Sequence, residues 1–418
     1  MHNALRRAPA RKALRIGTVA ALAMGTVAAL GMARAPAASA HRCGPTVTKQ
    51  FFGTAVEPFT GKPTKVFRFT LTNCRGMQVK LLTYGAIQQS ITVPGRNGKK
   101  ADVILGFKTL KDYVTKDSAP PPVGGPYFGE TIGRYGNRID EGTFVLDGHT
   151  YTLPINNGVN SLHGGLVGFG NHVWAATEVH GKGSAGVQLT LVSPDGDQGY
   201  PAQLTVVVTY TLNNDGQLGI HYSATNDSKN LATVLNLTNH SYFNLAGESS
   251  GAAYAQQVQI NADSFTPTDT GLIPTGVIAP VKGTPFDFTK PFAIGARITD
   301  VSAPQGDQLL IAQGYDHNWV LNRTGLKAGQ LGLAARASDP ASGRELTVWT
   351  TEPGVQFYAG NFLNGTLVGI SGHTYRQSAG YTFETQHYPN SPNQPNFPST
   401  VLNAGNTYNS TTIFAFSS

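Results

Sequence analysis

The chain has little of what metal and thiol chemistry usually needs. Only two of its 418 residues are cysteines, Cys43 and Cys74. No two histidines stand four residues apart, no His-Glu-x-x-His motif occurs, and the cysteines lack the short spacing of a zinc site. A Gly-x-x-x-x-Gly-Lys-Ser/Thr phosphate-binding loop is also missing. The sequence therefore predicts no metal, no cofactor and no catalytic thiol.

The first 40 residues have the pattern of a targeting segment. A mostly apolar run over residues 16–32 follows five basic residues and precedes Ala38-Ser39-Ala40, a small-residue cleavage signal. This pattern predicts a secretory signal peptide over residues 1–40 and a secreted protein, extracellular or periplasmic, with no membrane association after cleavage. The alternative is a retained anchor, although the apolar run is near the short end for a spanning helix.

Most of the positive charge belongs to the same segment. Residues 1–40 contain six Lys and Arg and no Asp or Glu, so cleavage would lower the formal charge from +7 to +1. No basic stripe remains for a nucleic acid partner. In an exported protein, Cys43 and Cys74 can form one disulfide, and two separate thiols are the alternative.

The remaining chain reads as β-structure throughout. Val, Thr, Tyr and Leu dominate residues 66–71, 79–82, 204–212 and 232–237. Turn signals of the Asn-Gly and Asp-Gly type occur at 96–98, 146–148 and 214–216. No sustained helical period appears in this part of the chain, and no long linker divides it. We therefore expect an all-β protein, a large antiparallel β-sandwich, with residues 41–418 forming a single domain.

The segment 384–399 is the most informative part of the chain. Four prolines recur there every third residue, which excludes a helix or a central strand and matches polyproline II geometry. The β-type residues Tyr381-Thr382-Phe383 precede it and deliver Glu384. A lone carboxylate brought by a strand to a stiff polar loop is well placed for proton transfer.

Several other clusters combine the side chains that recognise sugars. A hexose offers a ring of hydroxyls and an apolar C–H face. Asp, Asn, Gln and Arg can each hydrogen-bond to two adjacent hydroxyls, and Tyr or Trp can pack against the C–H face. Histidines add acid and base capacity near neutral pH. The candidate residues are Asn137, Arg138, His163, His240, Asp316 and Gln356.

Taken singly, each candidate has an ordinary structural explanation. A lone His is more often a satisfied structural residue than a catalyst, and Asp316 or Glu384 could be a solvated carboxylate at a turn or strand end. We expect Asn361 to be structural and His317, His373 and His387 to be non-catalytic. Asp316 and His317 could bind a metal together with His163 or His240 only if the fold happened to bring these residues together.

Taken together, these clusters carry a family resemblance. The chain resembles the aldose 1-epimerases, or galactose mutarotases, over nearly all of residues 50–415. Thr-Asn-His-Ser-Tyr-Phe-Asn-Leu at 238–245 and the tail at 384–399 are its most specific segments. The other matching segments, in the family's order, are 127–139, 162–165, 315–319 and 354–361.

The resemblance implies a β-sandwich with a sugar cleft and a free aldose as substrate. It implies that Glu384 is the general base and His240 the general acid of ring opening at C1. Asn137, Arg138, His163, Asp316 and Gln356 match positions that hold the sugar or support the transition state. We expect a monomer or weak dimer. The mechanism requires His240 to be protonated while Glu384 is ionised, so their pKa values must have that order in the free site.

Two other functions remain open from the residues alone. One is a glycoside hydrolase that uses Asp316 and Glu384 as its carboxyl pair, for which the separation of the two groups would decide. The other is a secreted sugar-binding protein without turnover. A phosphorylated sugar is disfavoured because no dense Arg or Lys cluster accompanies the motifs.

Overall fold

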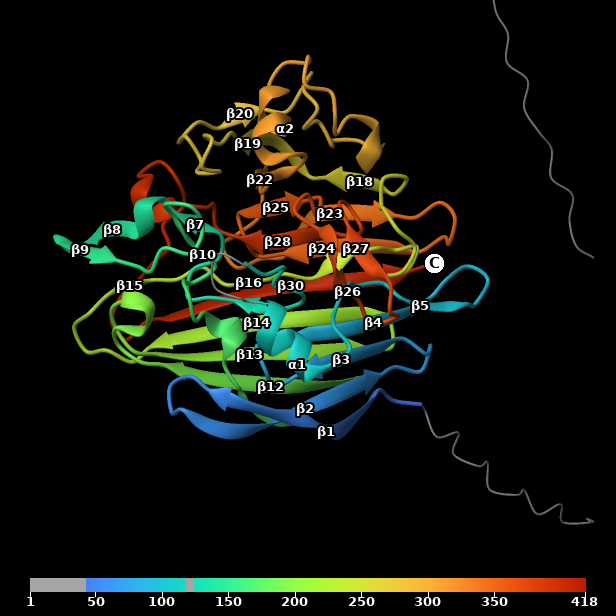
Figure 1. Ribbon diagram of the computed structural model, residues 1–418, viewed down its shortest axis with the longest axis horizontal. Coiled ribbons are helices and arrows are strands. Elements are labelled where there is room, and N and C mark those ends of the chain that lie inside the picture. The colour runs from blue at the N-terminus through green and yellow to red at the C-terminus, as the bar shows by residue number, and fades with distance from the viewer. Residues whose placement is uncertain (1–42, 118–123) are drawn as a thin grey trace, which may run out of the picture. The chain divides into compact units, whose positions relative to one another are not determined.

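Three large antiparallel sheets form most of the part of the chain that the structure describes (Figure 1). The computed structural model describes residues 43–117 and 124–418, so the expected signal peptide at 1–40 lies outside the described residues. Residues Cys43–Ser418 pack as one compact unit. No helix among the described residues combines the length and apolarity needed to cross a membrane.

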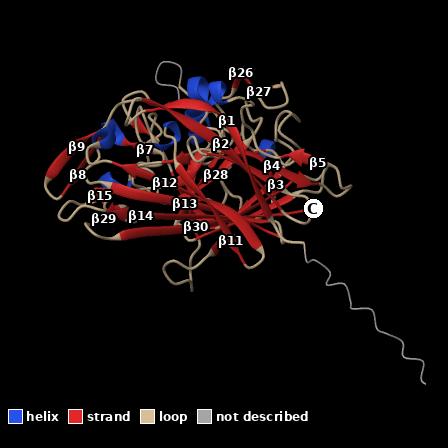
Figure 2. Ribbon diagram, turned by 90° about the horizontal axis from the view of Figure 1, so that it is seen from below, coloured by secondary structure: helices blue, strands red, loops and turns tan. Residues whose placement is uncertain are grey.

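The largest sheet has nine strands. In spatial order they are β11 (Ala175–Gly181), β12 (Ser184–Ser193), β13 (Leu204–Asn213), β14 (Gln217–Asn226), β30 (Thr407–Ser417), β24 (Glu345–Thr350), β23 (Gly332–Ser338), β18 (Gln257–Ile260) and β21 (Phe292–Ala293). β30 thus lies between β14 and β24 and pairs antiparallel with both. Figure 2 shows the long strands of this sheet side by side.

Two further sheets accompany it. The five-stranded sheet contains β1 (Thr46–Glu57), β2 (Lys62–Thr72), β3 (Gln78–Leu82), β4 (Gln88–Pro94) and β5 (Lys100–Asp102) in chain order. The six-stranded sheet has the order β17 (Tyr242–Phe243), β28 (Tyr381–Gln386), β25 (Gly354–Tyr358), β22 (Asp316–Leu321), β19 (Ala262–Thr266) and β20 (Ala279–Pro280).

Short strand pairs and helical turns complete the described fold. The pairs are β6 (Thr131–Ile132) with β16 (Thr238–Asn239), β7 (Arg138–Ile139) with β10 (Ser161–Leu162), β8 (Thr143–Leu146) with β9 (His149–Thr152), β15 (Thr233–Val234) with β29 (Val401–Leu402), and β26 (Asn364–Val368) with β27 (Thr374–Arg376). The α-helices are α1 (Leu110–Asp112) and α2 (Asp307–Ala312). The other turns are η1 (Tyr113–Asp117), η2 (Asp140–Gly142), η3 (Phe169–Asn171), η4 (Asp197–Gly199), η5 (Ile294–Ala296) and η6 (Ser391–Asn393).

The pattern of β13 shows why these segments form strands. Its ten residues alternate between buried and half-buried positions without a break. That period of two places one face on the core and leaves the other partly open to water. The β8–β9 turn places Asp147 at φ +50° and Gly148 at φ +77°, the left-handed region that a tight hairpin needs and that Asp-Gly readily adopts.

One hydrophobic cluster joins the three sheets. It includes Leu71 and Val79 of the five-stranded sheet, Leu189 and Val206 of the nine-stranded sheet, and Phe383 of the six-stranded sheet, all buried. Sheets that share one core in this way form a layered β-sandwich. The predicted all-β fold is confirmed. One predicted strand was too long, because only Thr233–Val234 of residues 232–237 pairs as a strand.

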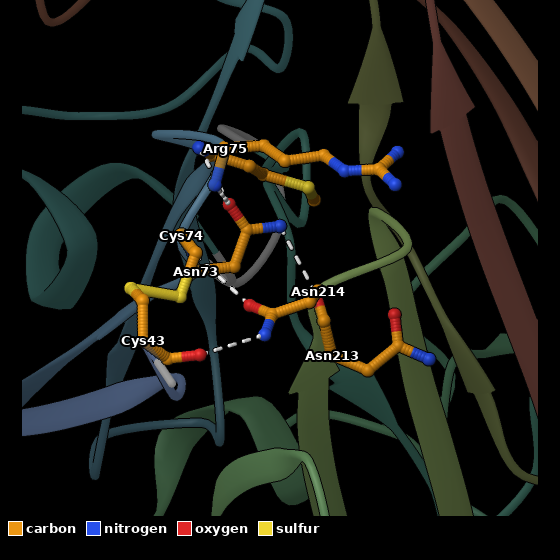
Figure 3. The surroundings of a disulfide bond; sticks show 7 residues. Cys43, Asn73, Cys74, Arg75, Asn213 and Asn214 are labelled. Carbon is orange, nitrogen blue, oxygen red and sulfur yellow. Dashed lines mark hydrogen bonds between the residues drawn. A yellow bond between two sulfur atoms is a disulfide. The ribbon is translucent and has the colours of Figure 1, made fainter. Parts of the chain in front are cut away.

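Cys43 and Cys74 form a disulfide (Figure 3). Asn214 holds both ends of it, since its side-chain oxygen accepts from the Cys74 amide at 3.0 Å and its amide nitrogen donates to the Cys43 carbonyl at 3.3 Å. Asn73 donates to the Asn213 carbonyl at 3.0 Å. The bridge and these amides therefore fasten the start of the five-stranded sheet to the β13–β14 turn.

We expect a Cys43→Ser, Cys74→Ser double variant to be less stable by about 2–4 kcal/mol, because the bridge closes a loop across a sequence separation of 31 residues and so restricts the unfolded chain. Urea unfolding under non-reducing conditions measures the difference. The wild-type protein with dithiothreitol should match the variant. Equal stability of the oxidised wild type and the variant would contradict this expectation.

Candidate active site

Strand register brings three of the candidate residues together in the six-stranded sheet. Gln356 on β25 pairs directly with Glu384 on β28 and with Asn318 on β22. Because side chains two residues apart share a face, Asp316 lies on the same face of β22 as Asn318. Gln356 Nε2 donates to Asp316 Oδ1 at 2.7 Å. Residues 316, 356 and 384 thus form one polar patch although they are far apart in sequence.

The remaining candidates come from short strand pairs. His240 follows β16, and its backbone exchanges hydrogen bonds with Gly129 and Glu130. His163 follows β10 and faces Asn137, which precedes β7. The Asn137 amide donates to His163 Nδ1 at 3.2 Å, and the His163 amide donates to the Asn137 carbonyl at 3.1 Å. Both residues have positive φ, which Asn and His tolerate better than most residues.

Six of the seven candidates line one cavity of about 800 Å³: Asn137, Arg138, His163, His240, Asp316 and Glu384. The seventh, Gln356, is buried behind Asp316 and supports it through the hydrogen bond described above. All seven side chains belong to residues that are at least nine-tenths buried. The structure therefore brings together every site residue that the sequence singled out.

Glu384 has one oxygen satisfied and one available. Oε1 accepts a hydrogen bond from the Thr382 hydroxyl at 2.9 Å, and Oε2 is buried without a partner among the described residues. A buried acceptor without a partner is costly, so its presence indicates a position that a ligand hydroxyl can fill. Gln356 Oε1 is buried and unpaired in the same way.

His240 stands next to this carboxyl group. Its Nε2 lies 3.5 Å from Glu384 Oε1. The imidazole contacts the rings of His163, Tyr127 and Tyr242, whose centroids lie 5.0, 5.9 and 5.1 Å away. An acid and a base at this separation can act on two oxygen atoms that are bonded to the same carbon atom.

The pKa values of the pair have the opposite order to the one expected from the sequence. Burial, together with the nearby Asp316 carboxylate, raises the pKa of Glu384 to about 8. Burial also lowers the pKa of His240 to about 3. Removal from water disfavours the charged form of each group. Before a sugar binds, the proton of the pair therefore resides on Glu384. The expectation that His240 is protonated while Glu384 is ionised in the free site was wrong.

Arg138 is held in place by a residue that the sequence analysis missed. Its Nε donates to Asn157 Oδ1 at 2.9 Å, and both residues line the cavity. With Nε engaged in this bond, the terminal amino groups of the guanidinium remain for other acceptors. Burial raises the pKa values of Asp316 and Glu384, and the charge of Arg138 opposes this increase at both groups. Asn157 lies in a loop of ordinary turn composition, so no sequence pattern marked it.

The neighbouring Arg134 has a different task. It is 2% exposed, does not line the cavity, and donates to the backbone carbonyls of Pro201, Ala202 and Pro194 at 2.8 Å each. It also bonds the Ser193 hydroxyl at 2.7 Å. Arg134 thereby ties the segment that carries Asn137 and Arg138 to the loop that follows β12.

The proline-rich tail differs in part from the expected geometry. Residues Ser391–Asn393 form a short 3-10 turn and not polyproline II, and Glu384 lies within β28 and not in the loop. The tail nevertheless supports the site. The Asn390 amide donates to the Arg138 carbonyl at 2.9 Å, and Asn390 Oδ1 accepts from the Asp140 amide at 3.1 Å.

The histidines set aside in the sequence analysis make structural contacts. His317 is buried, its Nδ1 accepts from the Asp316 amide at 3.2 Å and its Nε2 lies 3.2 Å from Gln308 Oε1, so it has no free nitrogen for a metal. His387 Nδ1 lies 2.7 Å from Glu352 Oε2 just beyond β28. Asn361 donates to the carbonyls of Ala312 and Tyr315, as its expected structural role requires.

Among the residues that the structure describes, the fold creates one possible metal-ligand set. Ligand atoms of His163, His240 and Glu384 all lie within 4.8 Å of one another. Two imidazoles and a carboxylate are a donor set that zinc accepts. Spacing along the chain could not reveal this set, because His163 follows β10, His240 follows β16 and Glu384 lies on β28.

Comparison with known proteins identifies the family of the chain. The family model described as aldose 1-epimerase matches residues 68–415. Pig galactose mutarotase is 45% identical over 341 residues, which cover 82% of this chain and 91% of the relative. Aldose 1-epimerase of Escherichia coli K12 is 36% identical over 358 residues, covering 85% and 96%.

Solved structures give the same result. The crystal structure of galactose 1-epimerase from Lactobacillus acidophilus matches with a TM-score of 0.73 and 29% identity over 89% of this chain and 99% of that one. A GalM/aldose epimerase homologue from C. elegans matches with a TM-score of 0.71 and 30% identity, covering 82% and 96%. The chain belongs to the aldose 1-epimerase family and is an isomerase that interconverts the anomers of aldoses.

Proposed function

We propose that Glu384 and His240 are the base and acid of anomer exchange, with free hexoses such as glucose and galactose as substrates. The observation that supports this most directly is the 3.5 Å separation of His240 Nε2 and Glu384 Oε1 inside the cavity. In a cyclic aldose the hydroxyl oxygen O1 and the ring oxygen O5 are both bonded to C1. Two groups this close can reach both oxygens at once.

The reaction moves two protons and breaks one ring bond. Glu384 as carboxylate takes the proton of the C1 hydroxyl, and protonated His240 gives its proton to O5 as the C1–O5 bond breaks. Rotation about C1–C2 turns the other face of the new carbonyl group toward O5. Closure with both transfers reversed gives the other anomer and restores both residues. Proton transfers of this kind each contribute about 10²–10⁴-fold to rate.

The Glu384–His240 pair holds one proton in its reactive form, and it also holds one proton before a sugar binds. In the empty site that proton is on Glu384, so transfer from Glu384 to His240 produces the reactive form without a proton from solvent. Arg138 favours this step because its charge lowers the pKa of Glu384. A sugar hydroxyl that donates to Oε2 would stabilise the carboxylate further.

The other five residues have binding roles in this proposal. Asp316, held by Gln356, can accept from one sugar hydroxyl, and Arg138, held by Asn157, can donate to another. Asn137 and His163 are fixed against each other by two hydrogen bonds, and both line the cavity. Burial, together with His240 and Arg138, lowers the pKa of His163 well below its ordinary value, so His163 binds as a neutral imidazole.

Polarimetry of freshly dissolved α-D-glucose and α-D-galactose tests the proposed substrates. We expect the purified protein to accelerate the change in rotation of both sugars toward the equilibrium value. An aryl glycoside serves as the control, because it lacks a free C1 hydroxyl and should remain intact. Release of the aryl alcohol, with no acceleration for either free sugar, would instead support the hydrolase that uses Asp316 and Glu384.

The pH profile should follow the one-proton state of the pair. With pKa values of about 3 for His240 and about 8 for Glu384, that state prevails between these limits. Above pH 8 the last proton leaves, His240 has none to donate, and kcat/KM should fall. Asp316→Asn removes a charge that raises the pKa of Glu384, so the alkaline limb should move to lower pH. An unmoved limb would contradict this coupling.

Export is a second part of the proposal. The basic, apolar and small-residue pattern of residues 1–40 supports a cleaved signal peptide. The Cys43–Cys74 disulfide is consistent with an oxidising compartment. N-terminal sequencing of the protein secreted by its native host should begin at residue 41. An intact N-terminus on protein retained in the cells would contradict export.

A further inference from the structure

The imidazole of His240 is not oriented by a hydrogen bond at its second nitrogen. Its Nδ1 is buried without a partner among the described residues. Its Nε2 lies 3.5 Å from Glu384 Oε1, beyond the usual hydrogen-bond length of about 2.7–3.2 Å. A histidine that moves protons is ordinarily oriented by a hydrogen bond to the nitrogen that does not react. In the described part of the chain, packing must therefore hold this ring.

Four aromatic rings surround the His240 imidazole. They belong to His163, Tyr242, Tyr127 and Tyr358, whose centroids lie 5.0, 5.1, 5.9 and 6.4 Å from it. Tyr242 and Tyr358 are buried parts of a hydrophobic cluster, whereas Tyr127 is half-buried at the cavity wall. Tyr127 is thus the ring that can be changed with the least damage to the core.

We propose that Tyr127 is a positioning residue for the acid of the reaction, whose ring keeps the His240 imidazole directed at Glu384. This inference rests on the proposed function, because it requires His240 to be the acid. The Tyr127 ring packs edge to face against His240 and also against His163, whose centroid is 4.7 Å away. The two imidazoles pack edge to face with each other as well. Each of the three rings therefore restrains the other two in a favourable geometry.

The backbone at Tyr127 is turned so that its ring meets the cavity. Tyr127 has φ +58°, a left-handed conformation that a bulky residue rarely adopts. The next side chain, Phe128, is fully buried and packs against Phe107 and Tyr242. Consecutive side chains thus serve the cavity and the core. Backbone strain of this kind persists only where the surroundings impose it, and it is concentrated at functional sites.

Hydrogen bonds fix this strained residue relative to His240. The Tyr127 amide donates to the Asp117 carbonyl at 3.2 Å, and the Phe128 amide donates to Asp117 Oδ1 at 2.7 Å. Three residues beyond Tyr127, the Glu130 carbonyl accepts from the His240 amide at 3.0 Å. The ring and the imidazole therefore stand on segments that are joined backbone to backbone, which keeps their separation constant.

Polarimetry with α-D-galactose on two variants tests the role of the ring. Tyr127→Phe keeps the ring and should retain kcat within about twofold. Tyr127→Asn removes the ring, and Asn tolerates the left-handed backbone, so this variant should fold. Its kcat should fall by about tenfold to a hundredfold, the cost of a displaced catalytic group, while KM changes by less than about threefold.

A double-variant cycle tests whether Tyr127 acts through His240. In a His240→Ala background the ring has no imidazole to hold. Adding Tyr127→Asn should then lower the residual rate by less than about twofold. The residual rate is measured at high protein concentration, above the spontaneous reaction.

Tyr151→Asn is the matched control. Tyr151 is also half-buried and stacks on Phe144, with centroids 5.3 Å apart, but it lies on β9 outside the cavity lining. Its replacement should leave kcat unchanged. Thermal unfolding of every variant ensures that folded proteins are compared. Tyr127→Leu, with the same expected loss, replaces Tyr127→Asn if the latter does not fold.

Three results would overturn the inference. One is a kcat of the folded ring-less variant within twofold of the wild type. Another is an equal loss in Tyr127→Phe, because the hydroxyl and not the ring would then matter. The third is an undiminished effect of Tyr127→Asn in the His240→Ala background. A wild-type rate in His240→Ala alone would refute the proposed function first, and the inference with it.

Discussion

Replacing Glu384 with Gln should lower kcat for anomer exchange by about 10²–10⁴-fold, the usual contribution of a positioned base. Gln keeps the shape and the acceptor for the Thr382 hydroxyl but cannot take the C1 proton. The fold should survive, because burial already holds Glu384 neutral in the empty site near pH 7. The variant should therefore be as stable as the wild type, or slightly more stable at alkaline pH.

Glu345→Gln is the matched control for this variant. Glu345 also lies on a strand, β24, but it is exposed and outside the cavity lining. Polarimetry and thermal unfolding on both variants separate catalysis from stability. A Glu384→Gln rate within tenfold of the wild type would show that another group removes the proton.

Arg134→Met should cost the largest amount of stability, about 3–5 kcal/mol. Met has a similar length but no donors, so the carbonyls of Pro194, Pro201 and Ala202 would be left without the partner they now share. Each buried acceptor that loses a charged donor carries a desolvation cost. Activity should also fall, since the loop that follows β12 would no longer hold the segment that bears Arg138 in place.

Urea unfolding followed by tryptophan fluorescence measures this loss. Arg336→Met is the control, because Arg336 is an exposed residue on β23 with no hydrogen bond to its side chain in the described part of the chain. Arg134→Lys should recover little stability, since one ammonium group cannot reach several carbonyls in the fixed arrangement that the guanidinium satisfies. A loss below about 1 kcal/mol for Arg134→Met would contradict the role given to this residue.

The β-fold was predictable because it depends on local patterns. Alternation in 204–212 and the Asp-Gly turn at 147–148 fix strands and hairpins within a few residues. The site residues were recognised through their motifs, and not through their spacing. The register that pairs Gln356 with Glu384 depends on strands from distant parts of the chain, which local patterns do not encode.

Other features depended on burial and could not be read from the sequence. The order of the pKa values of Glu384 and His240 was wrong because desolvation, which dominates both, is a property of the folded site. Asn157 was missed because only the fold brings it to Arg138. The 3-10 turn at Ser391–Asn393 replaced polyproline II because Asn390 and Asn393 bond to each other and to residues near 140.

The position of β30 has a consequence for how the protein is made. β14 and β24 each pair with β30, so neither has a partner on that side until residues 407–417 have left the ribosome. Until then two strand edges stay open to other chains. Long-range pairing of this kind folds slowly. The largest sheet therefore cannot be completed until the last strand of the chain has been synthesised.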